Sequence, residues 1–227
     1  MKKRVLSIFF ILIISMLGLV ACDSLKNKEY VATGSEYFEF IEREGDTYAL
    51  AVKEGVTLPE KLRLPSEYDG KPVVEIVANA FKNNTTITEV VIPAGYEIIG
   101  IEAFAYCTKL KVVNIGQYGG NTTRALTIRT AAFKGCSTLI DLTLGECVEV
   151  VDSYAFYETM VTGVNSRGLK EIGYNSFGNC ASLKSFYVPA TLVQIDGDAF
   201  AGSDSVTFSV SASNPVYSQE DGALVRK

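Results

Sequence analysis

The residue types that most often do chemistry in proteins are missing or poorly spaced in this chain of 227 residues. It contains no histidine, which excludes Ser-His and Cys-His nucleophile pairs and imidazole metal ligands. Its five cysteines lack the Cys-x-x-Cys spacing of a zinc site. Carboxylates recur at i, i+2 in Glu42 and Glu44 and in Asp196 and Asp198, where we expect solvated turn residues rather than an acid/base pair. The sequence therefore predicts no catalytic residue, no cofactor and no metal site.

One cysteine has a chemical role that its neighbours indicate. Residues 2–4 are basic, residues 5–20 form an almost unbroken apolar run, and the run ends in Leu19-Val20-Ala21-Cys22. A basic start followed by an apolar run is typical of a signal peptide. The final tetrapeptide resembles the lipobox of bacterial lipoproteins, which implies cleavage before Cys22 and acylation of its sulfur.

This resemblance implies an exported protein that a lipid on Cys22 holds on a bacterial membrane surface. The alternative is an uncleaved membrane anchor, but the apolar run is shorter than the ~20 residues that a spanning helix needs. Residues 1–21 are then the signal peptide, and the polar residues 22–35 are a short tether.

The charge of the chain argues against nucleic acid as a partner. Without residues 1–21 the chain keeps 18 basic and 26 acidic residues, which gives a formal charge of −8. Nucleic-acid binding requires clustered Lys and Arg to neutralise phosphates, and no long basic run is present.

The chain repeats the dipeptide Ala-Phe, with Ser-Phe once in its place. The six phenylalanines are separated by 23, 29, 23, 21 and 23 residues, and they are Phe81, Phe104, Phe133, Phe156, Phe177 and Phe200. A period in the twenties is the signature of a solenoid, in which each coil buries its apolar face against its neighbours. We therefore expect about six coils of 21–29 residues and one buried column of phenylalanine rings.

Each coil also contains a short run with strand composition. Leu183, Phe186 and Val188 illustrate the pattern, in which apolar residues point inward. One such strand per coil would build a parallel sheet. Its outward side chains would stack into columns and form the candidate binding face, which comprises Glu89, Val91, Lys111, Asn114, Asp141, Thr143, Lys184, Tyr187, Thr207 and Ser209.

Three cysteines share one position in the repeat. Cys107, Cys136 and Cys180 each follow a repeat phenylalanine by three residues, where other coils carry Asn84, Thr159 or Ser203. A slot filled by small residues favours buried free thiols over disulfides. Cys107 and Cys136 occupy adjacent coils, and for this pair a disulfide bond remains the alternative. Cys147 does not fall on the shared position of the repeat.

The first part of the folded chain has a different pattern. Residues 37–42 and 47–52 are rich in strand formers, and Arg43-Glu44-Gly45-Asp46 between them reads as a hairpin loop. The end of a solenoid exposes a sheet edge and an apolar face that something must cover. We expect residues 36–60 to form an N-terminal β-hairpin cap and residues 61–227 to form the repeat domain.

The repeat reads apolar-x-x-Ile-Gly-x-x-Ala-Phe-x-x-Cys-x-x-Leu-x-x-apolar-x-apolar-Pro. Residues 99–110 and 172–183 fit it closely, and it resembles the BspA-type leucine-rich repeat over roughly Leu62 to Lys227. The resemblance implies a leucine-rich-repeat solenoid. Members of this family are typically surface proteins, and several are described as adhesins.

The resemblance and the missing catalytic residues together favour a surface-anchored, non-catalytic binding module for an extracellular protein, such as an adhesin for host or community proteins. The first alternative is a structural protein of the cell envelope without an external ligand. The second is glycan capture, which needs neighbouring aromatic side chains. On the expected sheet face only Tyr187 is aromatic, and the chain has no tryptophan.

Overall fold

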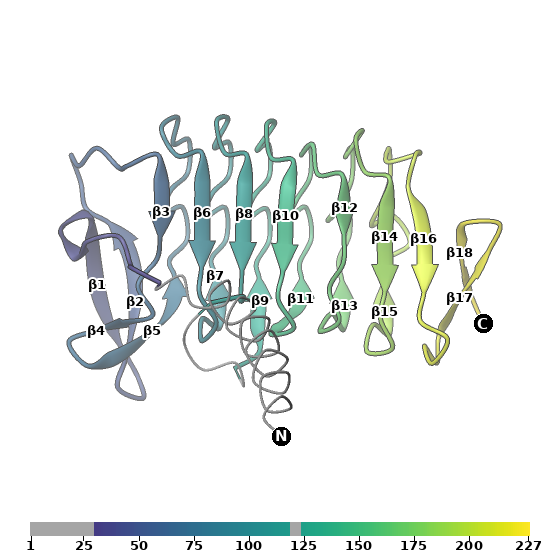
Figure 1. Ribbon diagram of the computed structural model, residues 1–227, viewed down its shortest axis with the longest axis horizontal. Coiled ribbons are helices and arrows are strands. Elements are labelled where there is room, and N and C mark those ends of the chain that lie inside the picture. The colour runs from purple at the N-terminus through teal and green to yellow at the C-terminus, as the bar shows by residue number, and fades with distance from the viewer. Residues whose placement is uncertain (1–29, 119–123) are drawn as a thin grey trace, which may run out of the picture. The chain divides into compact units, whose positions relative to one another are not determined.

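The computed structural model describes residues 30–118 and 124–227, of which Ala32–Lys227 form one compact unit. This unit is a solenoid of stacked coils with almost no helix, as Figure 1 shows. The predicted solenoid with parallel sheets is therefore confirmed. The predicted signal peptide, Cys22 and most of the predicted tether lie outside the described residues. No helix in the described ranges has the length and hydropathy of a membrane span.

The N-terminal end of the solenoid begins with the predicted hairpin. A 3-10 turn at Ser35–Tyr37 leads into β1 (Phe38–Arg43), which pairs antiparallel with β2 (Thr47–Val52). Asp46 in the connecting turn has a φ of 59°, in the left-handed region. β2 then pairs in parallel with β5 (Lys71–Ile76), while β4 (Glu67–Tyr68) pairs antiparallel with the same strand. The hairpin thus extends the sheet and places its own edge at the N-terminal end.

Each coil contributes two strands, not the single strand predicted from the sequence. The additional strand is the short aliphatic segment before each Ala-Phe or Ser-Phe turn. These segments pair in parallel from coil to coil and form what we call the long sheet, through β5, β7 (Ile98–Ile99), β9 (Leu126–Ile128), β11 (Val148–Val151), β13 (Glu171–Ile172) and β15 (Gln194–Ile195).

The predicted strands form the other side of each coil, in two ladders. The first consists of β3 (Lys61–Arg63), β6 (Glu89–Ile92), β8 (Val112–Ile115) and β10 (Asp141–Leu144). The second consists of β12 (Gly163–Val164), β14 (Ser185–Val188) and β16 (Thr207–Val210). The change from one ladder to the next falls at the coil of Phe156, where the repeat is shortened to 21 residues. A shorter coil leaves less chain to reach the strand register of its neighbour.

A second hairpin follows the last coil. Its strands β17 (Tyr217–Glu220) and β18 (Ala223–Arg226) are antiparallel, and the Phe208 N–H donates to the Gly222 carbonyl at 3.0 Å. Asn214 lies at its base and is 1% exposed. The hairpin is therefore tied to the last coil by backbone and side-chain hydrogen bonds.

The repeat phenylalanines form the predicted buried column. Consecutive rings are stacked with centroid separations of 4.5, 4.9, 5.2, 5.2 and 5.7 Å from Phe81 to Phe200. The rings of Phe104, Phe133, Phe156 and Phe177 are fully buried, whereas Phe200 is half-buried. Because successive rings of the column stack on one another, the column couples each coil to its two neighbours.

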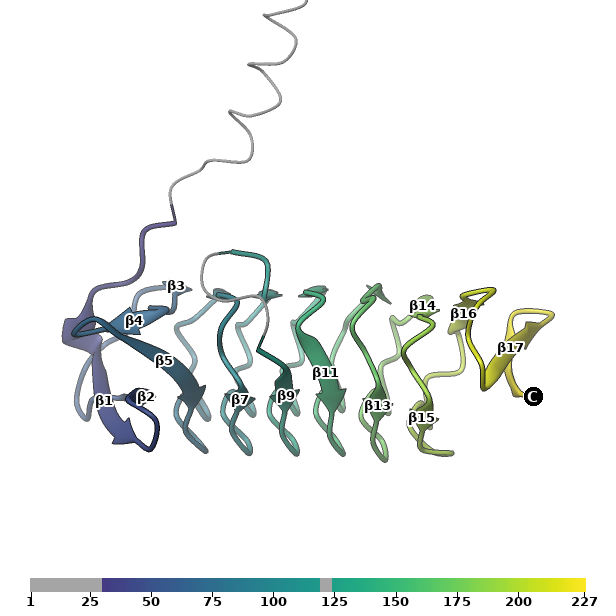
Figure 2. The same cartoon turned by 90° about the horizontal axis from the view of Figure 1, so that it is seen from below.

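The Ala-Phe segments form a third ladder, which we call the turn ladder. In five coils the residues two before and two after the phenylalanine have a positive φ of 51° to 68°, as at Asn79 and Asn83. Every second N–H then points to the next coil, so that the N–H of Phe104 donates to Ala132 O and that of Tyr106 to Lys134 O, both at 2.7 Å. The turns after β7, β9, β11 and β13 lie side by side along the lower edge of Figure 2.

The cysteine slot is filled by free thiols, as the repeat pattern predicted. All four described cysteines are free and buried, namely Cys107, Cys136, Cys147 and Cys180. The alternative of a Cys107–Cys136 disulfide bond is therefore wrong. The Cys107 Sγ donates to Phe81 O and the Cys136 Sγ to Phe104 O, both at 3.1 Å, which joins each slot to the preceding coil. Burial raises the pKa of the Cys136 and Cys180 thiols. These thiols therefore act as buried hydrogen-bond donors rather than as simple small hydrophobes.

Candidate functional site

Seven residues of the predicted binding face lie in register on the second side of the coils. Glu89, Asn114, Asp141 and Thr143 belong to the first ladder, where Asn114 pairs with Thr143. The other three lie in the second ladder, where Tyr187 pairs with Ser209 and Thr207 pairs with Ser185. These side chains are exposed or half-buried. We call this set the sheet face. Because the ladders separate between β10 and β12, it consists of two patches.

Three predicted face residues are placed differently by the structure. Val91 pairs in the expected register with Asn114, but it is 2% exposed and is therefore not part of the accessible face. Lys111 and Lys184 are exposed, but each precedes its strand by one residue, and Val112 and Ser185 occupy the expected register positions. The predicted columns are therefore corrected at these three positions.

The register error concerns the residue that lies just before the strand. The N–H groups of Lys111 and Val112 both donate to Thr88 O, at 2.9 and 3.2 Å. Two consecutive amides that share one carbonyl place an extra residue before the strand, as in a β-bulge. The period of two therefore runs from Asn114 back to Val112 and does not extend to Lys111.

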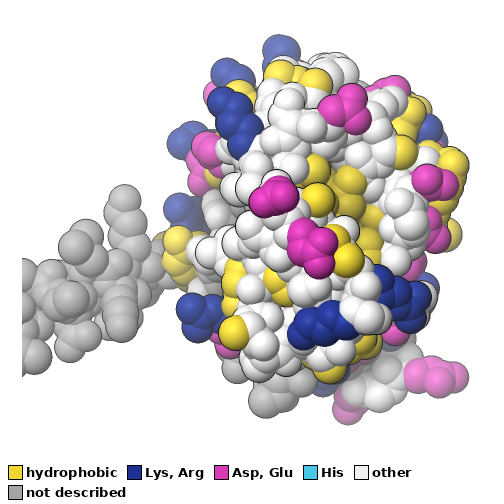
Figure 3. Space-filling view, turned by 90° about the vertical axis from the view of Figure 1, so that its right-hand side faces the viewer, with side chains coloured by type: hydrophobic (Ala, Val, Ile, Leu, Met, Phe, Trp, Pro, Cys, Tyr) yellow, Lys and Arg dark blue, Asp and Glu magenta, His cyan; other side chains and the backbone are white. Residues whose placement is uncertain are grey.

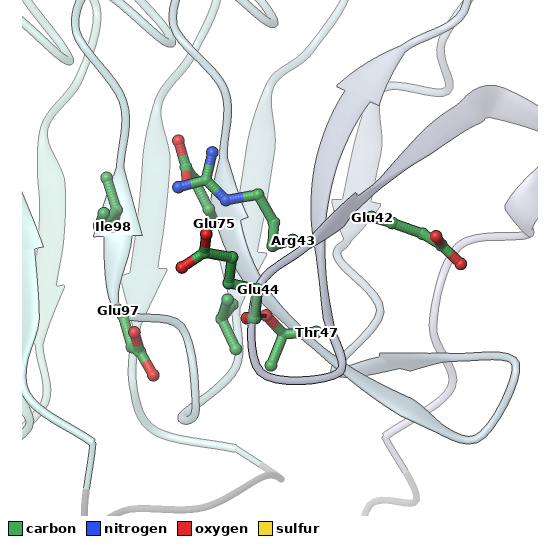
Figure 4. A pocket seen from close by; sticks show the side chains of 8 residues that line it. Glu42, Arg43, Glu44, Thr47, Glu75, Glu97 and Ile98 are labelled. Atoms are coloured by element: carbon green, nitrogen blue, oxygen red, sulfur yellow. Dashed lines mark hydrogen bonds and ion pairs between the residues drawn. The ribbon is translucent and has the colours of Figure 1, made fainter.

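The carboxylate pairs noted in the sequence do not form an acid/base site. Figure 4 shows the side chains of Glu42 and Glu44 pointing to opposite sides of the β1–β2 hairpin. The Arg43 guanidinium lies 2.8 Å from the Glu75 carboxylate, at a cavity of about 440 Å³ that Glu44 and Glu97 also line. Asp198 N–H donates to Asp196 Oδ1 at 3.1 Å, so this pair is a turn, as predicted. Within the described ranges, no group of three or more His, Cys, Asp or Glu residues is arranged to hold a metal ion.

A cavity of about 640 Å³ with mixed polar and apolar walls lies at the C-terminal end of the solenoid. Ile195, Phe200, Val206, Phe208 and Leu224 contribute its hydrophobic walls. Figure 3 views this end and shows hydrophobic side chains in the middle of the face, with acidic side chains beside them. The last ring of the phenylalanine column is thus only partly covered.

The repeat register and the fold both agree with one known family. A scan against family models matches residues 74–207 to the BspA type leucine rich repeat region, in six copies. The chain belongs to the BspA-type leucine-rich repeat family. No curated protein matches the chain.

Solved structures with the same fold include other BspA-like solenoids from bacteria. The Treponema pallidum leucine-rich repeat protein is 23% identical with a TM-score of 0.54, and the match covers 79% of this chain and 71% of that one. A leucine-rich cell surface protein from Faecalibacterium prausnitzii is 23% identical with a TM-score of 0.59, over 87% of this chain and 58% of the other. A leucine-rich repeat protein from Bacteroides ovatus is 22% identical with a TM-score of 0.58, over 81% and 53%. The chain therefore spans little more than half the length of the last two.

The turn ladder of this BspA-type solenoid carries a group of aromatic residues that the sequence pattern did not predict. Tyr154 lies 5.4 Å from both Tyr157 and Tyr174, measured between ring centroids. The Lys134 Nζ lies 5.6 Å from the Tyr154 ring and 5.5 Å from the Tyr157 ring. Strand alternation could not reveal this group, because its members lie in turns. Aligning the repeats on their phenylalanines places these positions in adjacent coils and is the signal that could have found them.

Proposed function

We propose that this protein is a lipid-anchored, non-catalytic binding module that recognises an extracellular protein at the bacterial surface. The observation that carries the proposal is the sheet face. Its side chains project from strands that parallel ladders join to the neighbouring coils, so they are held ready without a large entropic cost on binding. A rigid array of modest polar contacts suits recognition of a folded protein. The adhesin role belongs to the same proposal.

Tyr187 is the best single anchor of the sheet face. It is half-buried on β14, and its paired neighbour Ser209 is exposed. Tyrosine combines a large contact area with a hydroxyl and loses little conformational entropy on binding, which explains why it often dominates binding energy. Asp141, exposed on β10, is the matching charged position in the first patch.

The test compares a sheet-face variant with a matched control. Three proteins are applied to an array of purified extracellular-matrix proteins. They are the parent, a double variant of the sheet face (Asp141→Ala with Tyr187→Ala) and a double control variant (Glu171→Ala with Gln194→Ala). Glu171 and Gln194 are exposed on the long sheet, so the control removes side chains from the other side of the coils. We expect the sheet-face variant to lose at least about tenfold in affinity, or about 1.4 kcal/mol, and the control to bind like the parent.

Two outcomes would count against this proposal. Binding that the sheet-face variant leaves unchanged would assign recognition to another surface. A parent protein that binds none of the matrix proteins would favour the structural role in the cell envelope.

The membrane anchor is tested separately at Cys22. The tetrapeptide Leu19-Val20-Ala21-Cys22 supports acylation of the Cys22 sulfur, and several buried acyl chains at ~0.8 kcal/mol per CH₂ would hold the protein on a membrane. We expect Cys22→Ala to abolish incorporation of a labelled fatty acid and to shift the protein from the membrane to the soluble fraction. Incorporation of label into the Cys22→Ala protein would show that the anchor is elsewhere.

A further inference from the structure

The turn ladder presents a compact aromatic surface, which we call the tyrosine patch. It consists of Tyr154, Tyr157 and Tyr174, together with Lys134 and Asn179. Tyr174 is 40% exposed, and the other two rings are half-buried. Repulsion from Tyr154 and a hydrogen bond with it raise the pKa of Tyr174, so its hydroxyl stays neutral. The patch therefore offers ring surface and hydroxyl groups from two adjacent coils.

Tyr154 occupies a backbone position that a bulky residue adopts at a cost. Its φ is 59°, in the left-handed region that favours Gly and Asn. The equivalent residues of the first and fifth coils are Asn79 and Asn175, with φ of 60° and 51°. The coils of Phe104 and Phe133 carry Glu102 and Ala131 at this position, also with a positive φ. The fold therefore requires no aromatic ring here, and the Tyr154 ring is available for recognition.

The backbone beneath the patch has no free edge for a ligand strand. The N–H of Tyr154 donates to Tyr174 O at 2.9 Å, and that of Glu158 donates to Gly178 O at 3.0 Å. The N–H of Gly135 likewise donates to Tyr157 O at 2.8 Å. A peptide therefore has no ladder groups to pair with here, and a ligand is recognised by side chains alone.

The side chains around the rings are hydrogen-bonding groups without strong charge pairing. The Asn179 Nδ2 donates to the Tyr157 hydroxyl oxygen at 2.7 Å, which leaves the hydroxyl hydrogen of Tyr157 to donate elsewhere. Lys134 contributes three N–H donors beside two rings, and among the described residues no carboxylate forms an ion pair with it. Ring faces flanked by hydroxyl, amide and ammonium groups fit a ligand that is apolar on one face and hydroxylated at its rim.

We propose that the tyrosine patch binds a carbohydrate chain. The C–H face of a pyranose ring packs on the tyrosine rings, and its hydroxyls accept from Lys134 and exchange hydrogen bonds with Tyr157. This site lies on the turn ladder, so it goes beyond the protein-binding role proposed for the sheet face and stands or fails independently of it. It also supplies the neighbouring aromatic side chains that glycan capture requires.

The test exploits the asparagine found at the equivalent positions. The parent protein, Tyr154→Asn and a Tyr187→Ala control are applied to an array of immobilised neutral and uronic-acid-containing oligosaccharides, together with a polyproline decapeptide. We expect the parent to bind at least one oligosaccharide. Tyr154→Asn is expected to bind it at least tenfold more weakly while its Tm stays equal to that of the parent or rises, because backbone strain is relieved. Tyr187→Ala, on the sheet face, is expected to bind like the parent.

A second variant keeps the proposal open to contradiction if the first one misfolds. Tyr174→Ala removes an exposed ring without changing a left-handed position, and we expect the same tenfold loss. The proposal is overturned if the parent binds none of the oligosaccharides, if either folded variant binds them like the parent, or if the polyproline peptide is the sole probe retained. None of these results bears on the binding of matrix proteins by the sheet face, which is tested by its own variants.

Discussion

Replacing Phe133 by alanine is expected to lower the free energy of unfolding by about 3–5 kcal/mol. The ring is fully buried, and it stacks on Phe104 at 4.9 Å and on Phe156 at 5.2 Å. The substitution removes contacts with both neighbouring rings and leaves a cavity that the fixed coil spacing keeps from collapsing. Because coil stability depends on nearest-neighbour interfaces, the loss also weakens the coupling between the two halves of the solenoid.

Chemical denaturation followed by circular dichroism measures this effect. Ile101→Ala is the matched control, because Ile101 lies in the adjacent turn and is 51% exposed. We expect this control to change the free energy of unfolding by no more than about 0.5 kcal/mol. A Phe133→Ala protein destabilised by less than about 1 kcal/mol would mean that the ring column is not the core of the fold.

Replacing Asn214 by alanine has the second largest expected effect. The Asn214 Nδ2 donates to Pro189 O at 2.6 Å and to Leu192 O at 2.9 Å, while its Oδ1 accepts from the N–H groups of Val216 and Tyr217 at 2.9 and 2.7 Å. The variant leaves these buried groups without partners, and unsatisfied buried groups cost more than the bond itself contributes. We expect a loss of about 2–4 kcal/mol, concentrated in the β17–β18 hairpin.

Hydrogen exchange resolves where the stability is lost in the Asn214→Ala protein. Amides of β17 and β18 are expected to exchange faster by at least tenfold, whereas those of β8 and β9 keep their protection. Ser213→Ala is the control, since Ser213 is exposed and bonds only to Ser211. Unchanged protection of the hairpin would show that Asn214 does not hold it.

The features that depend on periodic spacing were predictable from the sequence. The Ala-Phe period identified the ring column because a residue repeated in register must stack on itself. It predicted about six coils, whereas the described strands form about seven, because the coil of β2 and β3 carries no Ala-Phe turn. The cysteine slot followed from the same alignment. Ser176 replaces the alanine of the Ala-Phe dipeptide before Phe177. Its buried hydroxyl has no hydrogen-bond partner among the described residues, so an alanine would fill this position as well.

The features that depend on local backbone geometry were not predictable in this way. The positions of Lys111 and Lys184 were wrong by one residue because each lies just before its strand, where the period of two no longer applies. The second strand of each coil was missed because segments such as Ile98–Ile99 are too short to show alternation. The tyrosine patch was missed because left-handed turn positions do not follow the inward and outward alternation that was used to locate the face.

The glycine in the Ile-Gly pair of the repeat has a specific structural cause. A Cβ built on Gly100 would lie 2.6 Å from both Ala78 N and Ile76 O of the preceding coil. Real Cβ atoms do not approach backbone that closely, so the local approach of these two coils requires glycine at position 100, whereas Arg129, Asp152 and Asp196 occupy the equivalent position in other coils. The repeat motif thus records coil-to-coil contacts, and it leaves the outward positions free to specify a partner.

Recognition of a partner through the sheet face is tested most directly by a single titration. A matrix protein that the parent binds on the array is titrated by calorimetry with three proteins. They are the parent, the sheet-face double variant (Asp141→Ala with Tyr187→Ala) and Tyr154→Asn. The account predicts at least about a tenfold weaker Kd for the sheet-face variant at unchanged Tm, and a parent-like Kd for Tyr154→Asn. Equal Kd values for the parent and a folded sheet-face variant would contradict it.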